Sequence, residues 1–172
     1  MVRIIGTILF LLTMVVSAHG EIRGEPVEYV AGDTTMKGYL AYDDSFSGKR
    51  PGILVVHEWW GNNEYTRKRA RMLAELGYVA LAVDMYGEGK QARHPDDAGK
   101  FSGEIRKNMP LGRERFLAAR KVLQENKFTD PGRIGGRDAN VFQRYFPEIE
   151  PKGYTCGRIP HAETLSLRVR TH

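Results

Sequence analysis

The stretch "ILVVHEWWG", residues 53–61, decides the fold that the chain can adopt. Its first four residues form a continuous apolar and largely β-branched run, which is typical of a strand buried on both faces of a parallel sheet. The run passes directly into the charged and aromatic cluster "HEWWG". In open α/β sheets, ligands bind just beyond the carboxyl ends of the strands. The stretch therefore predicts a central strand with a candidate site at its end.

The segments around this strand predict further strands on both sides of it in the chain. Two short antiparallel strands are expected at residues 26–30 and 35–42, with Gly32 and Asp33 in the turn between them. A second buried strand, at residues 78–83, is indicated by another continuous apolar run.

Three helices are expected between and after the buried strands. The first is capped by Asn62 or Asn63 and runs to about Leu76, with Met72, Leu73 and Leu76 on its inner side. A second helix starts at Asp96 and Asp97 and ends near Lys107, and a third opens at Pro110, with an apolar face made of Phe116, Ala119, Val122 and Leu123. Such alternating units give a mostly parallel sheet flanked by helices, so the predicted fold class is α/β.

The last 38 residues, 135–172, differ in composition from the rest of the chain. They contain three prolines and ten charged residues, and no apolar run of four. The motif "GGRDAN" at residues 135–140 indicates that no buried strand follows Ile134. We therefore expect an incomplete fold over residues 21–134, whose second buried strand lies at an uncovered edge, and an unrelated, disordered tail over residues 135–172. Our hypothesis is that the coding frame changes near Ile134.

The first 20 residues predict a secretory signal peptide. Arg3 precedes a largely apolar run at residues 4–16, and small residues follow, with expected cleavage after Ala18 or Gly20. The run is short for a membrane span, which needs about 20 residues, although an uncleaved anchor is the alternative. The mature chain is expected to be exported, to the periplasm or the medium, without stable membrane association.

The charge and the cysteine content limit the possible partners and the possible disulfides. The chain has 172 residues and a formal net charge of +5, but its basic residues are scattered among acidic ones, which is typical of solvated helix faces. Nucleic acid is therefore not an expected partner, and a basic surface-binding protein is the minor alternative. The single cysteine, Cys156, excludes an internal disulfide.

The stretch "RPGILVVHEWWGNNEYTRKRARMLAELGYVALAVDMYGEGK", residues 50–90, resembles the dienelactone hydrolase family of the α/β-hydrolases. "HPDDAGKF" at residues 94–101, "NMPLG" at 108–112 and "FTDPGRI" at 128–134 extend the resemblance, which covers residues 25–134. It implies the N-terminal portion of an α/β-hydrolase fold and hydrolysis of small esters or lactones without a cofactor. It also implies a Cys-His-Asp triad whose cysteine stands in a Gly-x-Cys-x-Gly turn after a buried strand.

The resemblance assigns roles to the cluster after the first buried strand. Glu58 matches the glutamate that contacts and tunes the nucleophilic cysteine, and Trp59 matches the residue whose backbone N–H helps to form the oxyanion hole. Trp60 and His57 are candidate substrate-binding residues. A competing interpretation is that the two tryptophans cover the core, that Glu58 pairs with an arginine, and that His57 is a packed histidine at a strand end.

The nucleophile and the later Asp and His of the triad are absent from the expected places. "GYTCG" around Cys156 has the wrong spacing and follows no buried strand, and no base or helix start is indicated that would activate the thiol. His161 and His172 complete no triad, and Asp130 is interpreted as a turn residue. His57, Glu58, His94, Asp96 and Asp97 match no compact metal motif, so no metal is expected.

The sequence therefore leads to two hypotheses. The first is an exported protein that descends from an ester or lactone hydrolase and is itself inactive. The second is a non-catalytic fragment or ligand-binding remnant that keeps the cleft beside Glu58, Trp59 and Trp60.

Overall fold

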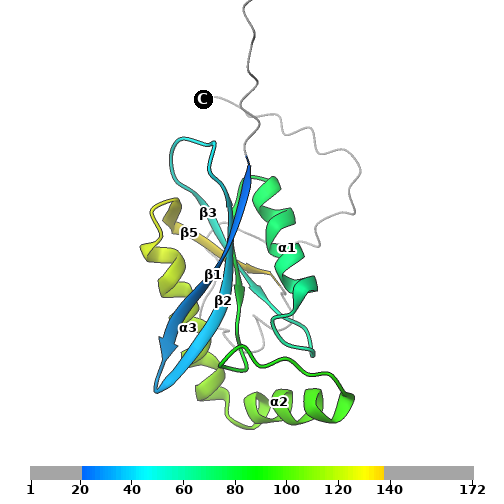
Figure 1. The fold of residues 1–172 in the computed structure, drawn as a ribbon. Helices are drawn as coiled ribbons and strands as arrows, with labels where there is room; N and C mark the ends of the chain where they lie inside the picture. The colour runs from blue at the N-terminus through cyan, green and yellow to red at the C-terminus, as the bar shows by residue number, and fades with distance from the viewer. Residues whose placement is uncertain (1–20, 138–172) are drawn as a thin grey trace, which may run out of the picture.

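The computed structural model describes residues 21–137, which form one five-stranded sheet with helices on both faces (Figure 1). The predicted signal peptide and residues 138–172 lie outside the described residues. The elements are, in chain order, β1 (Ile22–Ala31), β2 (Thr34–Asp43), β3 (Arg50–Val56), α1 (Glu64–Glu75), β4 (Val79–Val83), α2 (Pro95–Lys107), α3 (Met109–Glu125) and β5 (Thr129–Arg137). The predicted α/β class is confirmed.

The sheet is mixed, with the strand order β1-β2-β4-β3-β5. The hairpin of β1 and β2 is antiparallel and joins β4 in the antiparallel sense. The strands β4, β3 and β5 are parallel to one another, so that their carboxyl ends meet at one end of the sheet. This end carries the loops that can build a site.

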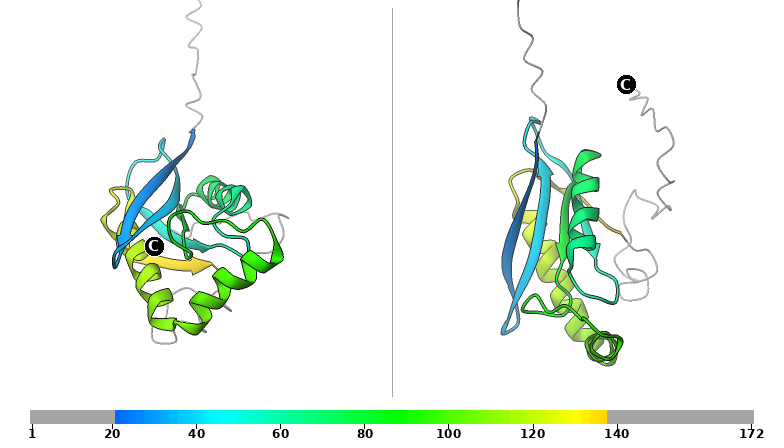
Figure 2. Two further views of the ribbon diagram at one scale, coloured as in Figure 1. Left: turned by 60° about the horizontal axis from the view of Figure 1, so that its bottom comes forward. Right: turned by 45° about the vertical axis from the view of Figure 1, so that its right-hand side comes forward.

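The centre of the core is β4, in which all five residues are buried. Successive side chains of a strand point to opposite faces of the sheet. Leu81 accordingly packs with Phe116 and Leu123 of α3, whereas Ala80 and Ala82 pack with α1. The two helices cover opposite faces of the sheet (Figures 1 and 2). Because helices cover both faces of the sheet at β4, all residues of this strand are apolar.

Helix α1 begins as predicted but turns a different face to the sheet. Asn63 is its N-cap, and the Asn63 side chain accepts a hydrogen bond from the Thr66 N–H. Leu73 is buried as predicted, with 1% of its surface exposed, but Met72 and Leu76 are 43% and 62% exposed. The inner stripe consists instead of Thr66, Ala70, Leu73 and Ala74. Their spacing is helical, and the small alanines let the helix approach the sheet closely.

Helices α2 and α3 lie where the sequence predicts them. The inner face of α3 includes the predicted residues Phe116, Ala119 and Leu123, all buried. Helix α2 buries only Ala98 and Ile105 and lies beyond the carboxyl ends of the parallel strands (Figure 2). None of the helices within residues 21–137 is long and apolar enough to cross a bilayer.

Strand β5 differs from the prediction, because it continues through Gly135, Gly136 and Arg137. These residues pair with β3 after a register shift, with Ile53 opposite Gly135 and Val55 opposite Arg137. The half-buried glycines carry no side-chain signal for a strand, yet their backbone groups can still pair with a neighbouring strand. The predicted boundary at Ile134 therefore falls inside β5. The prediction that the second buried strand is an uncovered edge is wrong, since β4 lies between β2 and β3.

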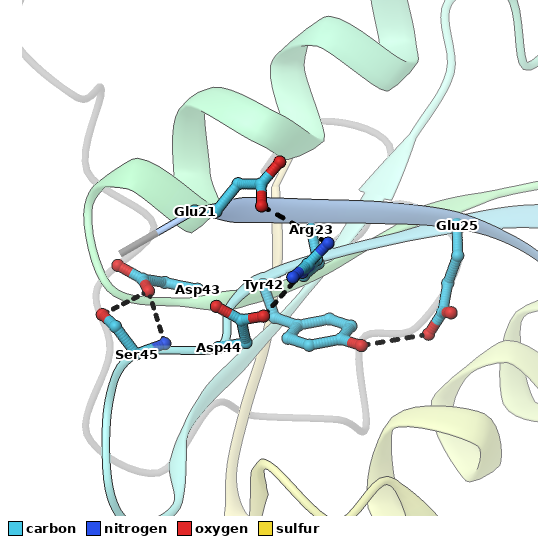
Figure 3. Close-up of polar contacts among 7 residues, drawn as sticks. All are labelled: Glu21, Arg23, Glu25, Tyr42, Asp43, Asp44 and Ser45. Carbon is cyan, nitrogen blue, oxygen red and sulfur yellow. Dashed lines mark hydrogen bonds and ion pairs between the residues drawn. The ribbon is translucent and has the colours of Figure 1, made fainter. Parts of the chain in front are cut away.

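The outer hairpin carries polar contacts at the open ends of β1 and β2 (Figure 3). The Arg23 guanidinium lies 2.6 Å from the Asp44 carboxylate and 3.4 Å from that of Glu21. The Tyr42 hydroxyl donates to Glu25 over 3.4 Å. Such exposed pairs contribute little to stability, because water and salt screen the charges. They neutralise part of the positive charge locally, in keeping with a solvated surface.

We expect the two leucines that the sequence predicts on the inner side of α1 to respond differently to truncation. Leu73→Ala removes a fully buried side chain and should lower the free energy of unfolding by about 2–5 kcal/mol. Leu76→Ala makes the same chemical change at an exposed position and should cost less than about 0.5 kcal/mol. Urea unfolding of both variants measures the difference, and equal losses would show that α1 is rotated relative to the structure described here.

Candidate active site

The candidate site lies at the carboxyl ends of the three parallel strands (Figure 1). Val56 at the end of β3 pairs with Val83 at the end of β4, and Val55 pairs with Arg137 at the end of β5. The segment after β3 and the loop after β4 therefore start side by side, and the chain leaves β5 next to them.

The segment after β3 is a tight turn. The Gly61 N–H donates to the Glu58 carbonyl over 3.3 Å, and the Asn63 N–H donates to the Gly61 carbonyl over 2.8 Å. Gly61 has a φ of +91°, and a Cβ at this position would lie 2.5 Å from the Lys90 carbonyl oxygen. Only glycine fits here, so the final residue of "HEWWG" holds the turn against the loop after β4.

Trp59 is anchored by its side chain and its carbonyl group. Its indole Nε1–H donates to the Ser102 hydroxyl of α2 over 2.9 Å, and its carbonyl accepts from the Tyr86 hydroxyl, also over 2.9 Å. In the part of the chain that the structure describes, the Trp59 N–H donates to no acceptor. This N–H is the predicted oxyanion donor. The oxyanion role itself stays a prediction.

Glu58 and Trp60 are exposed beside this N–H. Glu58 forms no ion pair with a basic side chain of residues 21–137, where the competing interpretation expects one with an arginine. The Trp60 ring is 5.5 Å from the Trp59 ring, and 37% of its surface is exposed. The two indoles thus provide apolar surface next to a carboxylate and a peptide N–H. The predicted roles of Glu58 and Trp60 are not tested by these contacts.

His57 is buried behind the turn, with both ring nitrogens bonded to backbone. Its Nε2 lies 3.2 Å from the Met85 nitrogen, which can only donate, so Nε2 accepts and the proton is on Nδ1. Nδ1 is 2.6 Å from the Glu58 carbonyl oxygen. Burial lowers the pKa of His57, although the hydrogen bond to Glu58 and the charge of Asp84 oppose this shift. The predicted contact of His57 with substrate stays a prediction.

Asp84, directly after β4, organises the neighbouring loop. Its carboxylate is fully buried and accepts four backbone N–H bonds of 2.8–3.0 Å, from Lys37, Tyr86, Gly87 and Gly89. This role is not among those predicted from the sequence, where an aspartate directly after the buried strand at residues 78–83 is the signal that could have indicated it.

The other candidate residues do not join this site. His94 is the N-cap of α2 and Asp96 and Asp97 lie in its first turn, where the sequence predicts a helix start. Asp130, predicted as a turn residue, lies within β5 and pairs with Pro51, and its carboxylate accepts from the Gly132 N–H over 3.0 Å where the register of the strand shifts. Among the described residues, no three His, Cys, Asp or Glu side chains are grouped to bind a metal. Cys156, His161 and His172 lie outside the described residues.

The arrangement therefore places a peptide N–H that has no acceptor among the described residues beside a carboxylate and two half-exposed indoles. A cysteine nucleophile could only be supplied from beyond Arg137, because residues 21–137 contain no cysteine.

The lowered pKa of His57 predicts a loss of stability in acid. The imidazole of an unfolded chain has a pKa of about 6.5, so below that pH the unfolded state binds a proton that the folded state does not bind. The free energy of unfolding should fall as the pH drops from about 7 to about 5, and His57 should contribute at most about 1.4 kcal/mol per pH unit. Urea unfolding across this range should show a shallower fall in His57→Gln.

The matched control for this experiment is His94→Gln, because His94 is exposed. The control should keep the pH dependence of the wild type. Equal slopes for the wild type and His57→Gln would contradict the account of a neutral, buried His57.

Most of the described residues match a known protein family. The model of the dienelactone hydrolase family matches residues 36–136. The protein named usf from Aquifex pyrophilus is 35% identical over 137 residues, which cover 73% of this chain and 58% of that protein. This chain thus spans less than two thirds of the length of that relative.

Two solved structures are similar in both fold and sequence. The structure titled m3DLH has a TM-score of 0.66 at 31% identity, and the match covers 68% of this chain and 49% of that chain. The dienelactone hydrolase-like promiscuous phosphotriesterase P91, from metagenomic libraries, has a TM-score of 0.64 at 31% identity, with 68% and 48% covered. Both matches span about half of the solved chain. With a family match that spans more than half of its residues, this chain belongs to the dienelactone hydrolase family.

Proposed function

We propose that this chain keeps the oxyanion-binding half of an ester or lactone hydrolase site and lacks the nucleophile half. It would then bind small esters, lactones or tetrahedral anions without hydrolysing them. The observation that carries the proposal is the position of Arg137, which pairs with Val55 at the carboxyl end of β3. The chain leaves β5 at this end of the sheet, and the next five residues in the sequence read "DANVF" rather than Gly-x-Cys-x-Gly.

The energetics favour binding without turnover. An oxyanion donor stabilises charge that develops in the transition state, but it forms no covalent intermediate. In a well-studied serine protease, loss of the nucleophile alone lowers kcat by about 10⁶-fold, and the residual rate comes from the oxyanion hole and from binding. A site with the Trp59 N–H and no nucleophile should therefore retain affinity and lose almost all of its rate.

The place of action follows from the first 20 residues. We infer export to the periplasm or the medium, on the pattern of Arg3, the apolar run and the small residues before Glu21. An exported, non-hydrolysing family member could hold a ligand with an apolar or ring-shaped body, because Trp59 and Trp60 supply half-exposed indoles.

The proposal predicts that the purified chain does not hydrolyse p-nitrophenyl acetate faster than its Glu58→Ala variant. Glu58 is exposed, so the substitution should leave the fold intact. Release of p-nitrophenolate, followed by absorbance, measures both rates, with Glu28→Ala as the control for removing an exposed glutamate outside the site. A wild-type rate well above that of Glu58→Ala would overturn the inactive assignment.

Binding is tested separately with phenylphosphonate, a tetrahedral anion that carries a ring. We expect a saturable shift of the Trp59 amide signal in ¹⁵N–¹H NMR spectra, because the N–H would gain an acceptor. Absence of any shift at Trp59 or Trp60 up to high millimolar concentrations would contradict the retained binding site.

A further inference from the structure

We propose that His57 and Tyr86 are positioning residues that aim the backbone N–H of Trp59 toward the site. His57 acts through the carbonyl of Glu58, and Tyr86 acts through the carbonyl of Trp59 itself. The claim that the oriented N–H binds a ligand rests on the proposed function. The claim that His57 and Tyr86 orient the N–H rests on the hydrogen bonds alone.

The first step concerns the peptide unit between Glu58 and Trp59. The Glu58 C=O and the Trp59 N–H belong to one planar, trans peptide group, so they point in opposite directions. Whatever fixes the direction of the carbonyl therefore fixes the direction of the N–H. A hydrogen bond accepted by the carbonyl also polarises the peptide group and makes its N–H a better donor.

The second step is that two donors hold the Glu58 carbonyl. They are the His57 Nδ1–H, at 2.6 Å, and the Gly61 N–H, at 3.3 Å. The His57 ring cannot turn away without losing its bond from the Met85 N–H, and it is packed edge-on against the Tyr86 ring at 4.5 Å. The shorter of the two bonds to the carbonyl thus comes from a side chain that is itself held.

The third step is that the next carbonyl along the chain is held as well. The Tyr86 hydroxyl donates to the Trp59 carbonyl over 2.9 Å. Tyr86 is buried, its N–H donates to the Asp84 carboxylate, and its ring lies 5.5 Å from that of Phe101. The Trp59 N–H therefore lies between two fixed carbonyl groups, so a ligand would not have to order it on binding.

A packed histidine with no positioning role is the competing account, and two substitutions separate the accounts. Asparagine carries its amide nitrogen at the same distance along the side chain as Nδ1, so His57→Asn can still donate to the Glu58 carbonyl. Glutamine reaches as far as Nε2, so His57→Gln can accept from the Met85 N–H but cannot hold that carbonyl. Both substitutions remove the ring and its packing.

The test measures backbone order at Trp59 by ¹⁵N relaxation in the full, ligand-free chain. We expect an order parameter of about 0.85 in the wild type and little change in His57→Asn. In His57→Gln and Tyr86→Phe, the order parameter of Trp59 should fall toward about 0.6, while the strands β3 and β4 keep theirs. Tyr65→Phe removes a hydroxyl from an exposed tyrosine of α1 and serves as the matched control.

The outcomes separate positioning from packing and from the proposed function. Equal order at Trp59 in His57→Asn and His57→Gln, or an unchanged value in Tyr86→Phe, would overturn the positioning role. If His57→Asn does not fold, Tyr86→Phe against Tyr65→Phe still decides the role of Tyr86. If the order pattern appears but phenylphosphonate does not bind the wild type, the proposed function fails and the positioning role stands.

If the proposed function and the positioning role are both correct, phenylphosphonate should bind about 3–10-fold more weakly to Tyr86→Phe and His57→Gln than to the wild type. The reason is that the Trp59 N–H would have to be ordered before it could donate to the ligand. Unchanged affinity in both variants would contradict the coupling between position and binding.

Discussion

The buried carboxylate of Asp84 is the interaction on which the geometry of the candidate site depends. A buried charge is costly unless it is hydrogen-bonded, and this one accepts four backbone N–H groups. One of them belongs to β2 and three to the loop after β4, so the carboxylate ties the sheet to that loop. The loop then presents Met85 to His57 and Tyr86 to Trp59. The donor N–H at the end of β3 is therefore held by a chain of contacts that starts at β4.

The described part of the chain brings together one side of the candidate site. The carboxyl ends of the parallel strands β4, β3 and β5 lie at the same end of the sheet. A tight turn follows β3, and a loop held by Asp84 follows β4. The third strand, β5, ends at Arg137, where the resemblance to the family implies the nucleophile, and the next five residues, "DANVF", contain neither glycine nor cysteine. In the proposed function, the oxyanion donor and the nucleophile belong to different segments, so binding could persist without catalysis.

The fold was predictable from sequence where burial leaves a pattern. Strands β3 and β4 are recognisable because both of their faces are covered, and the start of α1 because Asn63 caps it. The prediction that Met72 and Leu76 face the sheet is wrong, because hydrophobicity alone cannot distinguish an apolar residue that is buried from one beside the buried face of α1. The end of β5 was missed because Gly135 and Gly136 pair through the backbone only. The roles of Asp84 and Tyr86 depend on contacts to distant backbone groups, which no local pattern records.

Covalent trapping is the most direct test of the central claim, that this chain binds at an oxyanion donor but carries no nucleophile beside it. The full chain would be incubated with p-nitrophenyl acetate, quenched in acid and measured by intact mass and peptide mapping. We expect no stoichiometric acetyl group on any residue that follows Arg137. A stoichiometric adduct at one residue of that segment, Cys156 included, would contradict this claim and identify the nucleophile.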